Sequence, residues 1–261
     1  MTDVVTTTPA APPVAPGEVH VWLADVDAVD EGTLADLTAT LSSDERERAD
    51  RFVFDRDRRR FACGRGVLRH LLASYVGADA ASLRFAYGAH GKPTLSIPFD
   101  TGLLFNVSNS GSFALVAISR GLELGVDIEA IRPLADGDDI ASRFFSPREV
   151  AHLQSVPASA RHAAFFACWT RKEAYLKALG DGLALPLDTF DVTFVDGEPP
   201  RVRVADDASE GQRWSLIPLS APSGYAAALV IEGRVDRVKY GTWTASAAGR
   251  VGTVHQAMEA V

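Results

Sequence analysis

Apolar positions in the first half of the chain follow helical spacing in one long stretch and strand spacing in several short ones. Apolar residues recur every three to four positions over 56–75 and predict a helix there, which Gly77 ends. A short acidic helix is predicted to begin at Asp44, after Ser42 or Ser43. Strands are predicted at 19–23, 83–85, 91–95, 103–106 and 113–119.

The second half repeats this mixture of elements. A strand at 124–129 opens it, and helices are predicted at 140–145, 147–154 and 160–179, the last ending before a Gly-Asp-Gly stop. Further strands are predicted at 190–194, 201–204, 214–218 and 225–231. The pattern alone therefore indicates an α+β protein.

Two segments echo each other, because 110–118 and 223–231 each place an apolar strand after a Ser-Gly turn. Each segment closes a half that contains one long helix and several strands. Apolar echoes also arise by chance, so the sequence leaves duplication and coincidence both open. If the duplication is real, Asp127 and Glu129 lie just after the first half closes, at the junction of the two halves.

Composition narrows the class of protein. With 261 residues, 47% of them hydrophobic, the chain is long enough for a large core. A net charge of −8 argues against a general nucleic-acid binder, and the apolar runs are too short to span a membrane.

Cys63 and Cys168 lie in apolar stretches and are expected to be buried free thiols in a reducing compartment. Residues 1–17 lack the features of a signal peptide and predict a flexible tail, so we expect a cytoplasmic protein.

The strongest candidate chemistry combines a strand and a helix. Asp127 and Glu129 are two residues apart in an apolar run, so on a strand they share a face. Glu173 and Lys177 are four residues apart and share a helical face, with Lys172 beside them. Three carboxylates and two lysines suit a divalent cation, Mg²⁺ above all, held against a polyphosphate. Taken alone, Glu173 and Lys177 also fit an ordinary surface ion pair.

Ordered motifs along the chain resemble those of the Sfp-type 4′-phosphopantetheinyl transferases. In the second half they are Gly125-Val-Asp127-Ile-Glu129, then Arg143-Phe-Phe-Ser146 with Glu149, then Trp169-x-x-Lys172-Glu173-Ala-x-x-Lys177. In the first half they are Arg51-Phe52, Arg60-Phe61, Gly66-x-Leu68-Arg69, Gly91-Lys92-Pro93 and Phe105-Asn106-x-Ser108. The resemblance covers approximately residues 41–194.

The resemblance implies transfer of 4′-phosphopantetheine from coenzyme A to a serine of an acyl or peptidyl carrier protein, with release of 3′,5′-ADP. It also implies two similar, pseudo-duplicated α/β halves with the active site in the cleft between them. We expect residues 18–122 to form the coenzyme A-binding half and 123–243 the metal-binding and catalytic half. Residues 244–261 are expected to be a loosely packed tail. The fused halves indicate a monomer, and the net charge and short apolar runs indicate that it binds neither nucleic acid nor membranes.

The same resemblance assigns candidate residues. Asp127, Glu129 and Glu173 are the implied ligands of Mg²⁺, with Mn²⁺ as an alternative, and Glu173 is the implied base toward the carrier serine. Lys177 is the second catalytic candidate, near the departing phosphate. The implied coenzyme-binding residues are Arg48, Arg60, Gly91, Lys92, Pro93, Ser108, Asn109, Lys172 and Lys177.

One position departs from the family pattern. Where family members usually read Ser-His-Ser, with the histidine reaching the 3′-phosphate of the coenzyme, this chain has Ser108-Asn109-Ser110. Asparagine donates a neutral hydrogen bond and carries no charge toward a phosphate. We therefore predict weaker discrimination for the 3′-phosphate, or a nearby arginine in place of the histidine.

Two other functions use the same residues. A metal-dependent pyrophosphate hydrolase or nucleotidyl transferase would use the acids without a carrier protein. A binder of carrier protein or coenzyme would need no catalysis, and Asn109 gives slight reason to consider it. The complete set of three acids argues against the binder.

Overall fold

The computed structural model describes residues 11–88, 90–96, 98–99, 102–180, 185–195, 197–204 and 207–245, and the backbone of 254–259. In the first half the elements are β1 (Glu18–Asp25), α1 (Glu31–Ala39), α2 (Ser43–Asp50), α3 (Asp55–Val76), β2 (Phe85–Tyr87), β3 (Pro93–Leu95), β4 (Leu103–Ser110) and β5 (Phe113–Arg120). The predicted long helix is thus α3, and Gly77 ends it in the left-handed conformation.

The second half contains β6 (Leu124–Ala130), α4 (Gly137–Phe144), α5 (Pro147–Ser155), α6 (Arg161–Leu179), β7 (Phe190–Val192) and β8 (Val202–Val204). It continues through α7 (Ala208–Arg213), β9 (Trp214–Pro218), β10 (Tyr225–Glu232), β11 (Arg237–Trp243) and β12 (Val254–Glu259). No helix among the described residues combines the length and apolar character needed to cross a membrane.

The two halves share one topology. In the first half, β1 pairs antiparallel with β5 and β5 with β4, while α3 and the β2–β3 hairpin lie between them in sequence. In the second half, β6 pairs antiparallel with β10 and β10 with β9, with α6 and the β7–β8 hairpin between them in sequence. The echoing segments contain β5 and β10, which hold equivalent places. The predicted α+β fold of two similar halves is therefore confirmed.

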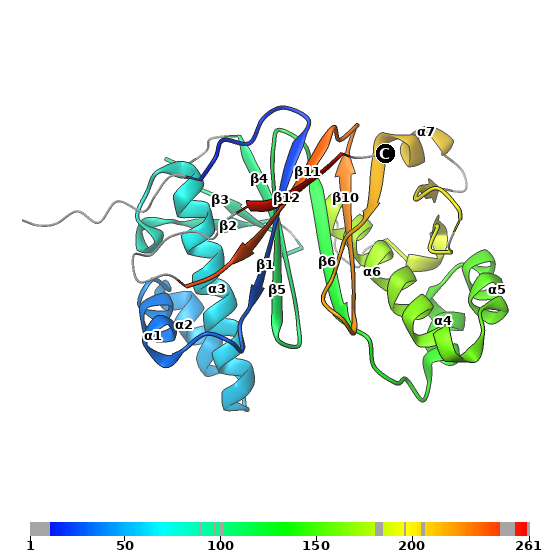
Figure 1. The fold of residues 1–261 in the computed structure, drawn as a ribbon, viewed down its shortest axis with the longest axis horizontal. Helices are drawn as coiled ribbons and strands as arrows, with labels where there is room; N and C mark the ends of the chain where they lie inside the picture. Colours follow the sequence, from blue (N-terminus) through cyan, green and yellow to red (C-terminus); the bar gives the residue numbers. More distant parts are fainter. Residues whose placement is uncertain are drawn as a thin grey trace, which may run out of the picture.

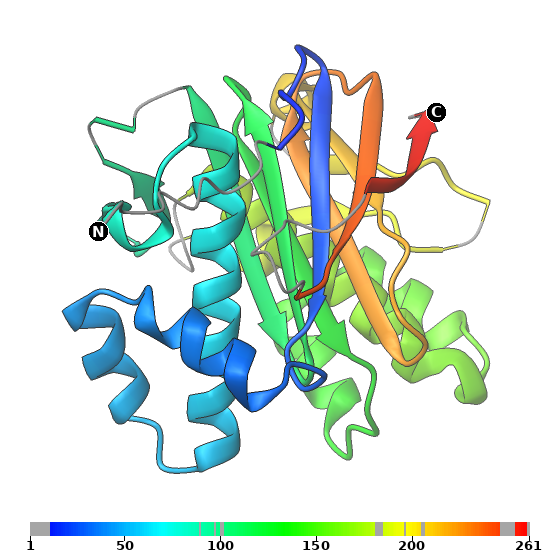
Figure 2. The ribbon, with the colours of Figure 1, turned by 60° about the vertical axis from the view of Figure 1, so that its left-hand side comes forward.

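The halves stack in four layers (Figure 1). Helix α3 packs on the outer face of the first sheet, where Trp22, Val116 and Leu71 belong to one core. Val126 and Leu229 belong to a second core, between the two sheets. Helix α6 covers the outer face of the second sheet in a third core. Figure 2 shows α3 running beside the strands of the first sheet.

Both chain ends differ from the predicted tails. Residues 1–10 lie outside the described part, but Val14 is buried in the first core and the Ala11 N–H bonds the Ser74 carbonyl at 3.0 Å. Strand β11 crosses back to pair in parallel with β1, so the first sheet has the order β12-β11-β1-β5-β4. Strand β12 then pairs with the free edge of β11 inside the predicted C-terminal tail. Each added strand forms hydrogen bonds with backbone groups that would otherwise be unpaired at the sheet edge.

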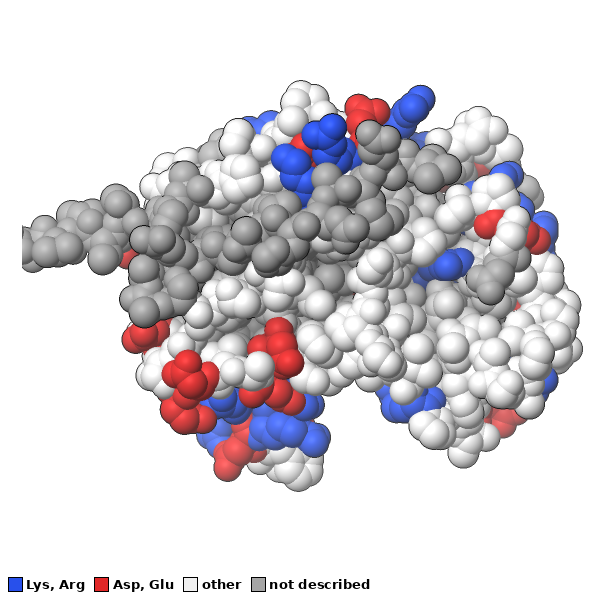
Figure 3. All heavy atoms as spheres, viewed as in Figure 1, with Lys and Arg blue, Asp and Glu red and all other residues white. Residues whose placement is uncertain are grey.

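Figure 3 shows the molecule hollowed at its lower edge, between a lobe formed by α1, α2 and the start of α3 and a lobe formed by α4 and α5. The start of β5 and the end of β6 lie at this edge (Figure 1). Lysine and arginine side chains alternate with acidic ones on the left-hand lobe. The hollow therefore leads toward the strand ends that carry the candidate residues.

Candidate active site between the two halves

Strands β4 and β6 lie at the edges of different sheets, and side chains of β4 bridge them. Asn106 Oδ1 accepts the Val126 N–H at 3.0 Å, and the Ser108 hydroxyl donates to Asp127 Oδ1 at 2.7 Å. The Ser110 hydroxyl donates to Glu129 Oε2 at 2.7 Å. Because every second residue of a strand faces the same side, these three residues of β4 act together along one seam.

The seam places Asp127 and Glu129 on the α6 side of β6. The intervening apolar residues point the other way, into the core between the sheets. Helix α6 approaches β6 closely at Gly125, where an added Cβ would stand 2.1 Å from the Ala174 carbonyl oxygen. This close approach brings Glu173 and Lys177 of α6 toward the strand carboxylates.

Four of the five residues predicted to act together line one cavity of about 480 Å³ with Asn109, Phe144 and Trp169; the four are Asp127, Glu129, Glu173 and Lys177. Lys177 Nζ lies 2.7 Å from Asp127 Oδ1 and 3.0 Å from Ser108 Oγ. The strand face and the helix face predicted separately therefore meet in one site. The hydroxyl of Ser108, predicted to contact the coenzyme, is engaged with Asp127 and Lys177 instead.

Negative charge is concentrated in this cavity. Burial, followed by the charge of Asp127, raises the pKa of Glu173 above its ordinary value. Burial also raises the pKa of Glu129, against the hydrogen bond from Ser110. Asp127 Oδ2 is buried and has no hydrogen-bond partner. The charge of Asp127 acts on both glutamates, and a bound cation would offset it.

The oxygen donors of this cavity are of the kind that Mg²⁺ binds. No three His, Cys, Asp or Glu side chains in the described ranges already stand close enough to hold one ion. Mg²⁺ commonly keeps several waters and takes one or two carboxylates together with phosphates, so a preformed cage is not required. The unpartnered oxygen of Asp127 and the two glutamates supply the oxygen donors that this ion prefers.

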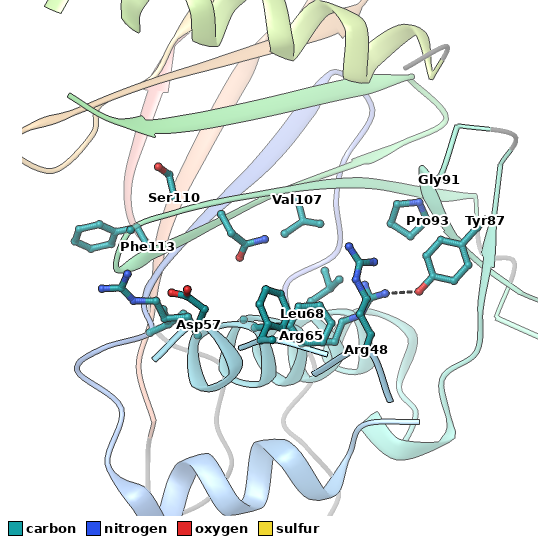
Figure 4. Close-up of a pocket in the computed structure, with 17 residues that line it drawn as sticks. Arg48, Asp57, Arg65, Leu68, Tyr87, Gly91, Pro93, Val107, Ser110 and Phe113 are labelled. Carbon is teal, nitrogen blue, oxygen red and sulfur yellow. Dashed lines mark hydrogen bonds between the residues drawn. The ribbon is translucent and has the colours of Figure 1, made fainter. Parts of the chain in front are cut away.

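A second cavity of about 520 Å³ adjoins the first and lies between α3, β4 and the β2–β3 hairpin (Figure 4). Val107 and Asn109 line both cavities. Five residues predicted to bind the coenzyme line this second cavity: Arg48, Arg60, Gly91, Pro93 and Asn109. In Figure 4 the hairpin residues Gly91 and Pro93 lie at one end and Phe113 at the other.

The arginines of this cavity differ in their partners. Arg60 forms an ion pair with Asp27 at 2.5 Å, and this bond lowers the pKa of the aspartate. Arg48 stacks on the Phe61 ring, with 5.3 Å to its centroid, and forms no ion pair with any described residue. Arg48 is therefore the cavity arginine whose charge is available to an anion.

Arg65 lines the same cavity, and the sequence reading did not single it out. Its Nε lies 2.8 Å from Glu45 Oε1, and it hydrogen-bonds the Tyr87 hydroxyl (Figure 4). It thereby fastens the β2–β3 hairpin to α3. The sequence offers no signal for Arg65, because only the structure shows that the neighbouring Gly64 faces Asn109.

Lys92 and Lys172 are absent from the lining of the second cavity. Lys92 lines a third cavity of about 270 Å³ with Glu173 and Lys177, but its ammonium pairs with Glu123 at 2.8 Å. Lys172 is fully buried, and its ammonium bonds Glu149 at 2.7 Å and the carbonyls of Leu187 and Phe190 at 2.8 and 2.6 Å.

The predicted phosphate contact of Lys172 is therefore wrong. Helical geometry gives the reason, because Lys172 is rotated by about 100° from Glu173 and faces the core rather than the cleft. It lies in line with Phe165, Cys168 and Leu176, all of them buried. That apolar spacing was a sequence signal for a buried lysine.

The fold and the site define a two-half α+β protein in which a cavity lined by carboxylates adjoins a cavity lined by arginines. Residues 30–120 match the family model of the 4′-phosphopantetheinyl transferase N-terminal domain, and residues 123–230 match that of the 4′-phosphopantetheinyl transferase superfamily. The chain is similar to 4′-phosphopantetheinyl transferase HetI of Nostoc sp., at 42% identity over 83% of this chain and 88% of that protein. The chain therefore belongs to the 4′-phosphopantetheinyl transferase superfamily.

Two further proteins are similar to this chain at lower identity. A putative 4′-phosphopantetheinyl transferase of Synechocystis sp. is 34% identical over 78% of this chain and 82% of that protein. The crystal structure of the holo-[acyl-carrier-protein] synthase of Thermotoga maritima aligns with 44% of this chain and 65% of that chain, at 20% identity and a TM-score of 0.35. Membership in the superfamily confirms the predicted family and enzyme class.

Proposed function

We propose that this chain transfers the 4′-phosphopantetheine group of coenzyme A to a serine of an apo acyl or peptidyl carrier protein, releasing 3′,5′-ADP. Membership in the superfamily supports the reaction. The assignment of roles to residues rests on one observation. Asp127, Glu129, Glu173 and Lys177 line a single cavity, and this cavity adjoins the larger one of about 520 Å³ between α3 and β4.

The larger cavity is the proposed coenzyme site. Gly91 and Pro93 would line its nucleotide end, and Arg48 and Arg60 would meet the 3′-phosphate together with Asn109. Arg48 is the stronger candidate for this phosphate contact, because its guanidinium has no acidic partner among the described residues. Lys92 would support the nucleotide end through its ion pair with Glu123, which ties the hairpin to the second half.

Asp127, Glu129 and Glu173 would hold Mg²⁺, or Mn²⁺ in its place. When bound, the ion supplies positive charge that offsets the charge of the pyrophosphate oxygens. Lys177 lies against Asp127 and would meet the departing phosphate. Glu173 lines both smaller cavities and would accept the proton of the carrier serine.

One chain lines all of these cavities, which supports a monomer as the working unit. The cysteines Cys63 and Cys168 are both buried free thiols, which supports a reducing cytoplasmic setting.

Substitution of Glu173 tests the assignment. We expect Glu173→Gln to abolish transfer, measured as the mass gain of an apo carrier protein, while thermal unfolding stays close to that of the wild type. Glu47→Gln, an exposed glutamate on α2, is the matched control and should transfer normally. Wild-type turnover by Glu173→Gln would refute its role. Loss of coenzyme A without a carrier product would favour a hydrolase.

A further inference from the structure

Ser110, the last residue of β4, bridges the backbone and a carboxylate of β6 with one hydroxyl. Its oxygen accepts the Ala130 N–H at 3.0 Å and donates to Glu129 Oε2 at 2.7 Å. A hydroxyl has a single proton, and an N–H only donates, so the proton is directed to the carboxylate. In Figure 4 the hydroxyl of Ser110 points away from α3.

Glu129 depends on this single anchor. Asp127 is held by both Ser108 and Lys177, whereas Ser110 is the only described residue that hydrogen-bonds the Glu129 carboxylate. Asn106, the third residue of the seam, accepts a hydrogen bond from the Val126 backbone and bonds no carboxylate of a described residue. Removal of the Ser110 hydroxyl would therefore free Glu129 to rotate, while Asp127 would keep its place.

The turn that carries Ser110 is itself fixed from the second half. The Tyr225 ring of β10 packs edge-on against Phe113, with 4.9 Å between centroids. Its hydroxyl lies 3.4 Å from the N–H and the hydroxyl of Ser112. Gly111, at φ +56°, has no room for a side chain, because an added Cβ would stand 2.4 Å from the Tyr225 hydroxyl. Ser110 is thus a rigid support for a residue of the other half.

We propose that Ser110 is a positioning residue for the transfer reaction, which holds one oxygen of Glu129 so that this carboxylate is oriented as a cation ligand. The inference rests on the proposed function. Residues that orient metal ligands typically change metal affinity about 10- to 100-fold when they are lost. A purely structural role would lower stability and leave cation affinity unchanged.

The test compares Ser110→Val with Ser110→Thr, which have the same shape but differ in the hydroxyl. Mn²⁺ affinity is measured by calorimetry in the presence of coenzyme A, because this reads the site without turnover. We expect Ser110→Thr to bind close to the wild-type affinity and Ser110→Val to bind about 10- to 100-fold more weakly. Ser155→Ala, at the exposed end of α5 and in the lining of neither adjoining cavity, should bind normally.

Transfer assays supply the second readout. We expect Ser110→Val to need proportionally more Mg²⁺ for half-maximal transfer and to regain most of its kcat at saturating Mg²⁺. Equal Mn²⁺ affinities for Ser110→Val and Ser110→Thr would overturn the proposal, as would unchanged affinity in Glu129→Ala. A wild-type chain that binds Mn²⁺ but transfers nothing would refute the proposed function. The role of Ser110 in cation binding would still be tested by the difference in Mn²⁺ affinity between Ser110→Val and Ser110→Thr.

Discussion

Replacing Lys172 by methionine should weaken the fold and leave the coenzyme site intact. Lys172 and Glu149 form an ion pair of 2.7 Å with side chains only 0% and 1% exposed. Methionine has a similar length and keeps the packing of α6 against the third core, so the change removes chiefly the charge. The ammonium also bonds the Leu187 and Phe190 carbonyls, which would lose a donor.

The magnitude follows from what remains around Glu149. Without Lys172, its carboxyl keeps the backbone N–H groups of Ser146 and Val192, at 2.9 and 2.7 Å. Breaking a buried pair costs about 3–5 kcal/mol of unfolding free energy. Burial already raises the pKa of Glu149 against the effect of Lys172, so the carboxyl can protonate, which limits the cost to about 3 kcal/mol. At about 2–4 °C per kcal/mol, the melting temperature should fall by about 6–12 °C.

The assay pairs thermal unfolding with calorimetric titration of coenzyme A below the melting temperature. Lys177→Met, the same change five residues along α6, should lose transfer with a smaller loss of stability, because Lys177 is 28% exposed. Combining Lys172→Met with Glu149→Gln should cost less than the sum of the two single changes. Unchanged melting with weaker coenzyme binding in Lys172→Met would refute this reasoning and restore the phosphate contact.

Three further predictions address other parts of the molecule. Gly125→Ala should destabilise the fold and abolish transfer, because the added Cβ would stand 2.1 Å from the Ala174 carbonyl oxygen. Gly88→Ala, whose Cβ would lie 3.8 Å from the nearest atom, is the control and should melt at the wild-type temperature. Equal melting temperatures for the two variants would contradict the close packing at Gly125. Asn109→His should raise the preference for coenzyme A over its dephospho form about fivefold, because a hydrogen bond from a charged donor is about 1 kcal/mol stronger than one from a neutral donor. The preference should rise further at lower pH, where more of the histidine is protonated. An unchanged ratio of the two dissociation constants would place Asn109 outside the phosphate site. Burial lowers the pKa of His20 below 6.5, so its contribution to stability is complete above that pH and is lost below it. In urea unfolding, His20→Gln should therefore lose less stability than the wild type between about pH 7.5 and 5.5, and parallel losses would argue against this assignment.

Local pattern predicted the elements with the strongest periodicity. The helix predicted over 160–179 is α6 at Arg161–Leu179, and the duplication suggested by two Ser-Gly turns is present in the topology. Helix α1 was not predicted, because Leu37 is its only buried residue and its apolar face is correspondingly weak. Strand β11 was missed because its pairing with β1 joins residues more than 200 positions apart, which no local pattern encodes.

The site was predictable where residue spacing alone decides which side chains share a face. Asp127 with Glu129, and Glu173 with Lys177, follow strand and helix periods, and the structure brings both pairs to one cavity. Spacing could not show that β4 and β6 belong to different sheets, and hence that Ser110 bridges them. The motif by itself does not separate buried from exposed members, and the role of Lys172 was misjudged because the motif was followed rather than the apolar spacing that includes this lysine.

The most direct test of the whole account is intact-mass spectrometry of an apo carrier protein incubated with this chain, coenzyme A and Mg²⁺. The account predicts a gain of one phosphopantetheine on the carrier serine, abolished by EDTA and by Asp127→Ala. No gain on any of several carrier types, with coenzyme A still bound, would contradict it and identify the chain as a binder of the coenzyme.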